Sequence, residues 1–258
     1  MTNWARRHPL TTFFVLAFLF TWALLPLARA SLAVSLVALW GPAVAAAITA
    51  RASGRHDFMD LRRRVTSWRA PIGWYLAAVL LPLPITALRS AIESLAGAEG
   101  AIRLQPVSAL NLIVFVLVAG EEIGWRGFAL PRLLSRSGAC GASTILGLLW
   151  ALWHLPLFFM PGMPQYGTPF LSYVPYLIAL SFILTMLARP TAGSVIIATL
   201  FHGAVNTFGI VNTGASAAQR GWGNALSYGI AALVIGTIAW HTRSNRRREL
   251  PSSAVIST

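Results

Sequence analysis

Long runs of apolar residues dominate the hydrophobic pattern of this chain. Eight windows, each close to 20 residues long, contain few polar positions: 10–28, 31–50, 71–92, 108–130, 143–160, 171–188, 192–211 and 224–241. A helix of about 20 residues crosses a hydrocarbon core about 30 Å thick. The pattern therefore predicts an all-α, polytopic membrane protein with eight transmembrane helices, forming a single integral membrane domain over residues 1–258.

The composition supports this class. Only 10% of the 258 residues are charged and 56% are hydrophobic, whereas soluble domains carry about 25% charged residues. A surface with so few charges would not keep a soluble monomer solvated. We therefore expect no soluble domain, and the chain shows no internal repeat.

The net charge of +13 at first suggests nucleic-acid binding, but the placement of the charges favours a membrane orientation. All 20 basic residues are Arg, and 15 of them fall in segments that eight spans would place on one side: Arg6, Arg7, Arg51, Arg55, Arg62, Arg63, Arg64, Arg69, Arg132, Arg136, Arg189, Arg243, Arg246, Arg247 and Arg248. The positive-inside rule then places both termini in the cytoplasm, which an even number of spans also requires. We expect a protein of a bacterial cytoplasmic membrane whose basic loops contact lipid headgroups, and no nucleic-acid partner.

Three local features refine this picture. An Arg pair, an apolar run and an Ala-Arg-Ala string at 28–30 mimic a signal peptide, but the run is longer than usual, so we expect an uncleaved first span. Segment 51–70 is expected to be a cytoplasmic interfacial segment in which Asp57 and Asp60 pair with Arg side chains. Cys140 is the only cysteine, which leaves no disulfide framework and predicts an inert thiol.

Ionisable residues inside spans are costly and therefore point to function. Apart from Arg89 and His241 near span ends, the predicted spans hold few polar groups of this kind: Glu121, Glu122 and Arg126 in the fourth, His154 in the fifth, and His202 with Asn206 in the seventh. Glu122 and Arg126 are spaced i, i+4, so they share a helix face and can neutralise one another. A lone buried His154 or Asn206 could equally be a structural residue.

Taken together, these groups can assemble a hydrolytic centre from three helices. Glu121 lies about 100° around the helix from Glu122 and is free to face another element. A carboxylate could act as general base on a water, a His could orient that water, and His with Asn could stabilise an oxyanion. We therefore predict that Glu121, His154, His202 and Asn206 form one site.

Residues that are absent exclude other chemistry. Without Lys there is no Ser–Lys dyad, lysine Schiff base or P-loop. No H-E-x-x-H string is present. The only aspartates, Asp57 and Asp60, share one loop, and no G-x-S-G string occurs. An intramembrane hydrolase of this sequence must use glutamate.

The motifs Glu121-Glu122-x-x-x-Arg126, Trp150-x-x-x-His154 and His202-x-x-x-Asn206 resemble those of the CPBP family. These are the CAAX-processing and bacteriocin-processing intramembrane endopeptidases, the Abi group, related to the eukaryotic type II CAAX prenyl protease. The similarity covers about 108–211, which would be the catalytic core. The family usually has Phe where this chain has Trp150.

The resemblance implies roles for these residues. Glu121 would activate the water with His154 beside it, His202 and Asn206 would polarise the scissile carbonyl, and Glu122 with Arg126 would brace the helix. The substrate would be a membrane-tethered protein or peptide, prenylated or CAAX-like, cut near its C-terminus.

Some alternatives remain open. Glu121, His154 and His202 form a His₂Glu set of the kind that binds zinc, although we favour a metal-independent glutamate mechanism with no cofactor. A proton-coupled transporter, or a non-catalytic peptide-binding or immunity protein, would use the same residues differently. Transporters often contain duplicated halves, which this sequence lacks.

Overall fold

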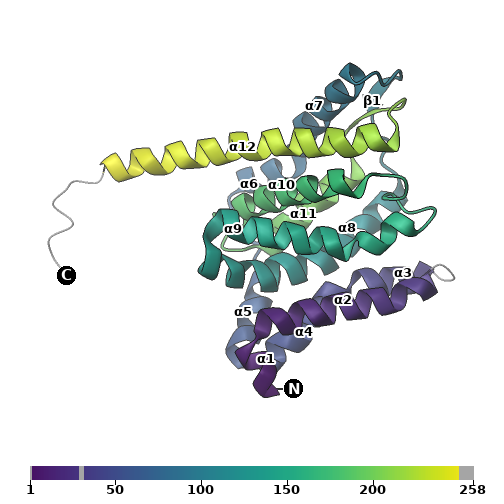
Figure 1. Cartoon of the computed structure of the whole chain (residues 1–258). Helices are drawn as coiled ribbons and strands as arrows, with labels where there is room; N and C mark the ends of the chain where they lie inside the picture. Colours follow the sequence, from purple (N-terminus) through teal and green to yellow (C-terminus); the bar gives the residue numbers. More distant parts are fainter. Residues whose placement is uncertain (1, 29–31, 250–258) are drawn as a thin grey trace.

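A computed structural model describes residues 2–28 and 32–249, and nearly all of them are helical (Figure 1). The helices before the first motif are α1 (Thr2–Arg7), α2 (Pro9–Ala28), α3 (Leu32–Leu39), α4 (Gly41–Ser53), α5 (Arg55–Val65), α6 (Ile72–Leu80) and α7 (Pro82–Leu95). The remaining helices are α8 (Ala109–Glu122), the π-helical η1 (Ile123–Ala129), α9 (Leu130–Trp153), the 3₁₀ turn η2 (Leu155–Phe159), α10 (Phe170–Ala188), α11 (Val195–Thr207) and α12 (Ala217–Glu249).

A small antiparallel sheet joins two distant parts of the chain. β1 (Ile102–Leu104) pairs with β2 (Ile210–Asn212), with Arg103 opposite Val211. β1 precedes α8 and β2 follows α11, so the pairing holds the start of α8 close to the end of α11. These two helices carry the Glu and His–Asn motifs, and they pack against each other.

The predicted all-α membrane architecture is confirmed, but the number of crossings stays a prediction. Among the described residues, five helical segments are long and apolar enough to cross a membrane: Pro9–Leu27, Ile72–Leu95, Ile113–Phe159, Phe170–Ala188 and Ala217–Thr242. Window 192–211 forms the shorter α11, and window 31–50 is divided between α3 and α4.

The segment Ile113–Phe159 is 47 residues long and contains two of the predicted windows. Its helix is interrupted at Gly138, where the backbone has φ 64° and ψ −173°. Glycine adopts such a left-handed conformation without the Cβ penalty of other residues. The chain folds back there (Figure 1), so that the second half of α9 packs against α10 and brings Trp150 to Glu121.

The third predicted window ends too early. α7 continues to Leu95 and includes Glu93, which is buried and lies 3.3 Å from Arg89 in an ion pair. Glu93 therefore belongs with the ionisable groups inside the candidate span, although the apolar pattern stops before it. The apolar pattern stops early because the charged residues Arg89 and Glu93 lower the hydropathy of the last turns of α7, although the two side chains pair with each other.

Aromatic side chains form the core around the motif helices. Phe13, Trp125, Trp150 and Trp153 are almost completely buried, and the Trp125 and Trp153 ring centroids lie 5.8 Å apart. Gly147 lets α9 approach α10 closely, because a Cβ there would lie 2.6 Å from the Ile178 Cα. Small residues commonly permit such close packing of membrane helices.

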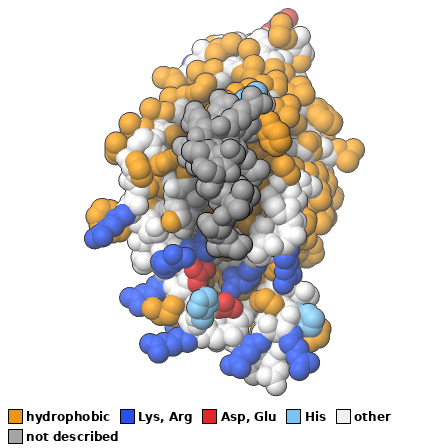
Figure 2. All heavy atoms as spheres, turned by 90° about the vertical axis from the view of Figure 1, so that its left-hand side faces the viewer, with side chains coloured by type: hydrophobic (Ala, Val, Ile, Leu, Met, Phe, Trp, Pro, Cys, Tyr) orange, Lys and Arg blue, Asp and Glu red, His pale blue; other side chains and the backbone are white. Residues whose placement is uncertain are grey.

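The outer surface is apolar, as expected for a membrane protein. α12 exposes Leu233, Ile238 and Trp240 by 61–73%, as expected for a face in contact with lipid. α1, α5 and the last turns of α12 lie toward the same side of the bundle, at the left of Figure 1. Figure 2 looks onto that side and shows Arg side chains gathered at its lower end, below a largely hydrophobic surface. Which face of the membrane this is stays a prediction.

Candidate active site

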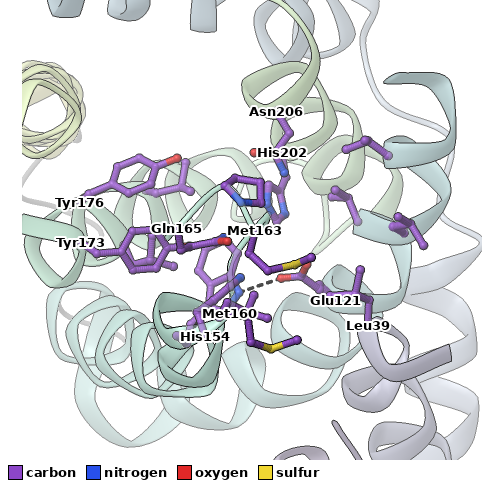
Figure 3. A pocket seen from close by; sticks show the side chains of 18 of the residues that line it. Leu39, Glu121, His154, Met160, Met163, Gln165, Tyr173, Tyr176, His202 and Asn206 are labelled. Carbon is purple, nitrogen blue, oxygen red and sulfur yellow. Dashed lines mark hydrogen bonds between the residues drawn. The ribbon is translucent and has the colours of Figure 1, made fainter. Parts of the chain in front are cut away.

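A cavity of about 590 Å³ lies between the helices that carry the three motifs. Glu121, His154, His202 and Asn206 all line it, so the structure brings the four predicted site residues together (Figure 3). The rest of its wall is mostly apolar or aromatic and comes from α2, α3, α8, α9, α10 and the segment after His154: Leu25, Leu39, Val114, Leu117, Val118, Trp150, Leu157, Met160, Pro161, Met163, Pro164, Gln165, Tyr173, Tyr176, Leu177 and Leu180.

Glu121 stands at the C-terminal end of α8, where the backbone changes from an α-helix to the π-helix η1. Its side chain is 6% exposed. Oε2 accepts a hydrogen bond of 2.8 Å from Nε1 of Trp150, drawn as the dashed line in Figure 3. Its other oxygen, Oε1, is left to interact with a ligand in the cavity.

His154 ends α9, directly before the 3₁₀ turn η2. Nδ1 lies 2.9 Å from the carbonyl oxygen of Trp150. A carbonyl only accepts hydrogen bonds, so Nδ1 carries the proton in the neutral ring and Nε2 has the lone pair. Edge-to-face contacts with Trp153 and Tyr173, at centroid distances of 4.7 and 5.5 Å, hold the ring in place.

His202 and Asn206 lie one turn apart on α11. His202 is 4% exposed, and its Nδ1 lies 2.8 Å from Oε1 of Glu122. Hydrogen bonding of Nδ1 to a carboxylate leaves Nε2 as the nitrogen available for a ligand. Asn206 is exposed and lines the cavity beside it, so α11 presents an imidazole and an amide to the same space.

Glu122 connects two of the motifs. Oε1 accepts a hydrogen bond of 2.9 Å from Nη1 of Arg126 as well as the contact with His202, and both Glu122 and Arg126 are almost completely buried. The predicted Glu122–Arg126 pair is therefore present, but the sequence analysis assigned Glu122 to Arg126 alone. The carboxylate also orients His202, which only the folded arrangement of α8 and α11 reveals.

Trp150 contacts three of the four predicted site residues. Its Nε1 binds Glu121, its carbonyl binds His154, and its ring meets the His202 ring edge-to-face at 5.0 Å. The Arg126 guanidinium carbon also lies 4.2 Å from the centre of the indole. The sequence offered one signal of this role: at position 150 the chain has Trp, with an indole N–H that can donate a hydrogen bond, in place of the Phe that the resemblance leads us to expect.

The zinc alternative, with Glu121, His154 and His202 as ligands, stays a prediction. Among residues 2–28 and 32–249, no three His, Cys, Asp or Glu side chains lie close enough together to hold a metal ion. Glu121 Oε2 is also occupied by the Trp150 N–H. Chelation and elemental analysis of the purified protein decide whether a metal takes part.

The fold and the site define an all-helical membrane protein with a buried polar cavity built from one carboxylate, two imidazoles and an amide. Residues 103–208, which carry all of these groups, match the family model described as type II CAAX prenyl endopeptidase Rce1-like. Over these residues the chain is similar to this CPBP/Rce1-like family.

One curated protein is also similar to this chain. The chain is similar to CAAX prenyl protease 2 of Methanococcus maripaludis, with 31% identity over 141 residues, covering 51% of this chain and 49% of that protein. The chain thus spans about half the length of the curated relative it matches.

Proposed function

We propose that this protein is an intramembrane endopeptidase that uses glutamate-activated water to cut a peptide bond near the C-terminus of a membrane-tethered protein. The observation that carries the proposal is that Glu121, His154, His202 and Asn206, which come from three motif helices, line one cavity. The similarity of residues 103–208 to the Rce1-like family model, and of the chain to a CAAX prenyl protease, supports a protease of this kind.

In the first step, a water molecule between Glu121 and His154 loses a proton to the Glu121 carboxylate and attacks the scissile carbonyl carbon. His154 orients this water by accepting a hydrogen bond at Nε2, because its Nδ1 is held by the Trp150 carbonyl. The carbonyl π electrons move to the oxygen, which becomes an oxyanion. Glu121 then transfers the proton to the leaving nitrogen as the C–N bond breaks.

The oxyanion needs donors that are already in place. The Asn206 side-chain amide supplies one, and His202 supplies a second through Nε2 when its ring is protonated. The Glu122 carboxylate stabilises that imidazolium from the opposite side through Nδ1. Removing a single oxyanion donor typically lowers kcat by about 10²–10³-fold.

The substrate class follows from the wall of the cavity and from the relative. Leu, Met and aromatic side chains make up most of the lining, and the relative is named a CAAX prenyl protease. We propose a C-terminal peptide with a CAAX-like sequence, attached to the membrane by a prenyl group.

The test is cleavage of defined peptides by the full chain in lipid nanodiscs, followed by mass spectrometry. Farnesylated and unmodified CAAX-like peptides would be compared, together with a transmembrane peptide. Glu121→Gln removes the base with little change in shape, and Glu99→Gln is the matched control because Glu99 is exposed outside the cavity. We expect cleavage by the wild-type protein and by Glu99→Gln, and none by Glu121→Gln.

Two outcomes would contradict the proposal. Equal cleavage by wild type and Glu121→Gln would mean that another group activates the water. Absence of cleavage of every peptide, combined with ion-gradient-dependent flux in liposomes or with unchanged peptide binding by Glu121→Gln, would favour a transporter or a non-catalytic binding protein. Preference for the farnesylated peptide tests the substrate class separately.

A further inference from the structure

A second cavity, of about 410 Å³, is lined by four Arg side chains and by no acidic residue. We call it the basic cavity. It lies between α5, the start of α9 and the turn that follows α10, and its lining is Arg63, Arg64, Arg126, Leu130, Pro131, Leu134, Ala188, Arg189, Ala192 and Gly193. It shares no lining residue with the catalytic cavity.

Among the described residues, three cations of the basic cavity, Arg63, Arg64 and Arg126, share two carboxylates. Arg63 and Arg64 share the single carboxylate of Asp60, with N–O distances of 2.8 and 2.9 Å. Arg126 has Glu122, whose same oxygen also binds His202. Two carboxylates therefore serve several cations, and the space between the guanidinium groups favours an anion.

Arg126 supplies the strongest evidence for a ligand. It is 1% exposed and only Nη1 is hydrogen-bonded, whereas Nε and Nη2 have no partner within the described residues. Buried donors left without a partner are costly, and such groups in proteins usually bind water or a ligand. These two nitrogens belong to a side chain that lines the basic cavity.

We propose that the basic cavity binds a phosphate group, carried by an anionic phospholipid headgroup or supplied as free phosphate. The planar guanidinium group matches phosphate oxygens in paired hydrogen bonds. The position of the cavity also suits a headgroup. Ser194, which follows the lining residue Gly193, donates a hydrogen bond to the Ser67 carbonyl, and the next residue, Trp68, is 64% exposed beside Arg69, as in interfacial anchors. Basic pockets between membrane helices bind lipid headgroups in this way.

The experiment measures binding directly and does not depend on peptide cleavage. The purified full chain, in a neutral detergent, is titrated by calorimetry with inorganic phosphate, with dihexanoyl phosphatidic acid and with zwitterionic dihexanoyl phosphatidylcholine. Arg64→Gln and Arg63→Gln remove cavity cations one at a time. Arg62→Gln is the matched control, because Arg62 is exposed on the same helix and does not line the cavity.

We expect wild type to bind phosphatidic acid with a Kd that rises about tenfold or more in Arg64→Gln, as for loss of one charge-assisted hydrogen bond, and changes little in Arg62→Gln. Arg126→Lys keeps the charge that faces Glu122 but removes the guanidinium fork, and it should weaken binding similarly. Equal binding of inorganic phosphate and phosphatidic acid would show that the cavity recognises the phosphate group and not the rest of the lipid. Binding of the lipid alone would identify a headgroup site, and binding of inorganic phosphate alone would identify a site for free phosphate.

The proposal is overturned if wild type binds neither phosphate ligand, if phosphatidylcholine binds as well as phosphatidic acid, or if Arg62→Gln and Arg64→Gln weaken binding equally. The last result would mean general attraction to a basic surface. Size-exclusion profiles and unfolding temperatures of every variant show whether a loss of binding reflects loss of the fold.

Discussion

The indole N–H of Trp150 donates a hydrogen bond of 2.8 Å to the Oε2 atom of Glu121. The proposed base is therefore held by a side chain located 29 positions later, on the helix that also presents His154. The hydrogen bond fixes one carboxylate oxygen and leaves the other facing the cavity. An aromatic residue without an N–H, such as Phe, could fill the space but could not hold the carboxylate.

This relationship predicts the effect of Trp150→Phe. If Glu121 is the base, the variant should lower kcat about tenfold or more, in line with loss of a hydrogen bond to a charged group, with little change in KM. Trp125→Phe is the matched control: Trp125 is fully buried in the same aromatic core, and its Nε1 has no hydrogen-bond partner among the described residues. Equal losses of kcat in both variants would argue that only packing matters at position 150.

A second prediction concerns the stability of the buried charge group. Glu122→Gln leaves Arg126 without its carboxylate in an almost fully buried position. Breaking a buried pair in this way typically lowers the free energy of unfolding by about 3–5 kcal/mol. Chemical unfolding in detergent should show this loss, while Glu99→Gln should change little.

The double variant Glu122→Gln/Arg126→Gln separates the ion pair from other effects. Because it removes both charges, its loss of unfolding free energy should be smaller than the sum for the two single variants. A double variant whose loss equals that sum would mean that the two side chains stabilise the fold independently.

A third prediction is a pH-dependent contribution from α5. Burial raises the pKa of Asp60, but the hydrogen bonds and charges of Arg63 and Arg64 together lower it by more. The folded-state pKa therefore lies below the ordinary value. A carboxylate of this kind contributes stability that is complete above its unfolded pKa of about 4 and is lost as the pH falls through the folded value. Asp60→Asn should reduce this acid-dependent loss in unfolding curves, and an unchanged curve would contradict the assignment.

A fourth prediction addresses the metal. If the water is activated by Glu121 alone, peptide cleavage should survive prolonged treatment with phenanthroline and EDTA, and elemental analysis should find no stoichiometric zinc. Loss of cleavage that zinc restores, but magnesium does not, would establish the His₂Glu alternative. The same samples should retain their unfolding temperature, which separates loss of a catalytic ion from loss of the fold.

Much of the architecture could be predicted from local pattern. Apolar windows identify helices because a helix that faces lipid must be apolar, and the i, i+4 spacing of Glu122 and Arg126 predicted their pairing, found at 2.9 Å. The number of crossings could not be predicted in the same way. Windows of similar hydropathy form a short helix, a divided helix or a long helix reversed at Gly138, depending on tertiary packing.

For the site, too, the sequence pattern predicts which residues take part but not how they contact one another. Rarity of polar residues in apolar windows was enough to select Glu121, His154, His202 and Asn206, and the structure places them around one cavity. Contacts between helices were beyond the sequence pattern: the Trp150–Glu121 hydrogen bond spans 29 residues and the His202–Glu122 contact spans 80. Such pairs depend on the fold of the whole bundle.

The π-helix η1 places one extra residue within the first motif segment. The N–H of Leu130 bonds to the carbonyl of Trp125 there, five residues back instead of four, so the turn contains one residue more than an α-helix. A π turn rotates the chain less per residue than an α-helix does, so the seven residues of η1 cover about the same rotation as six α-helical residues. The extra residue is therefore accommodated inside the turn, and α8 and the start of α9 keep nearly the relative orientation of one continuous α-helix.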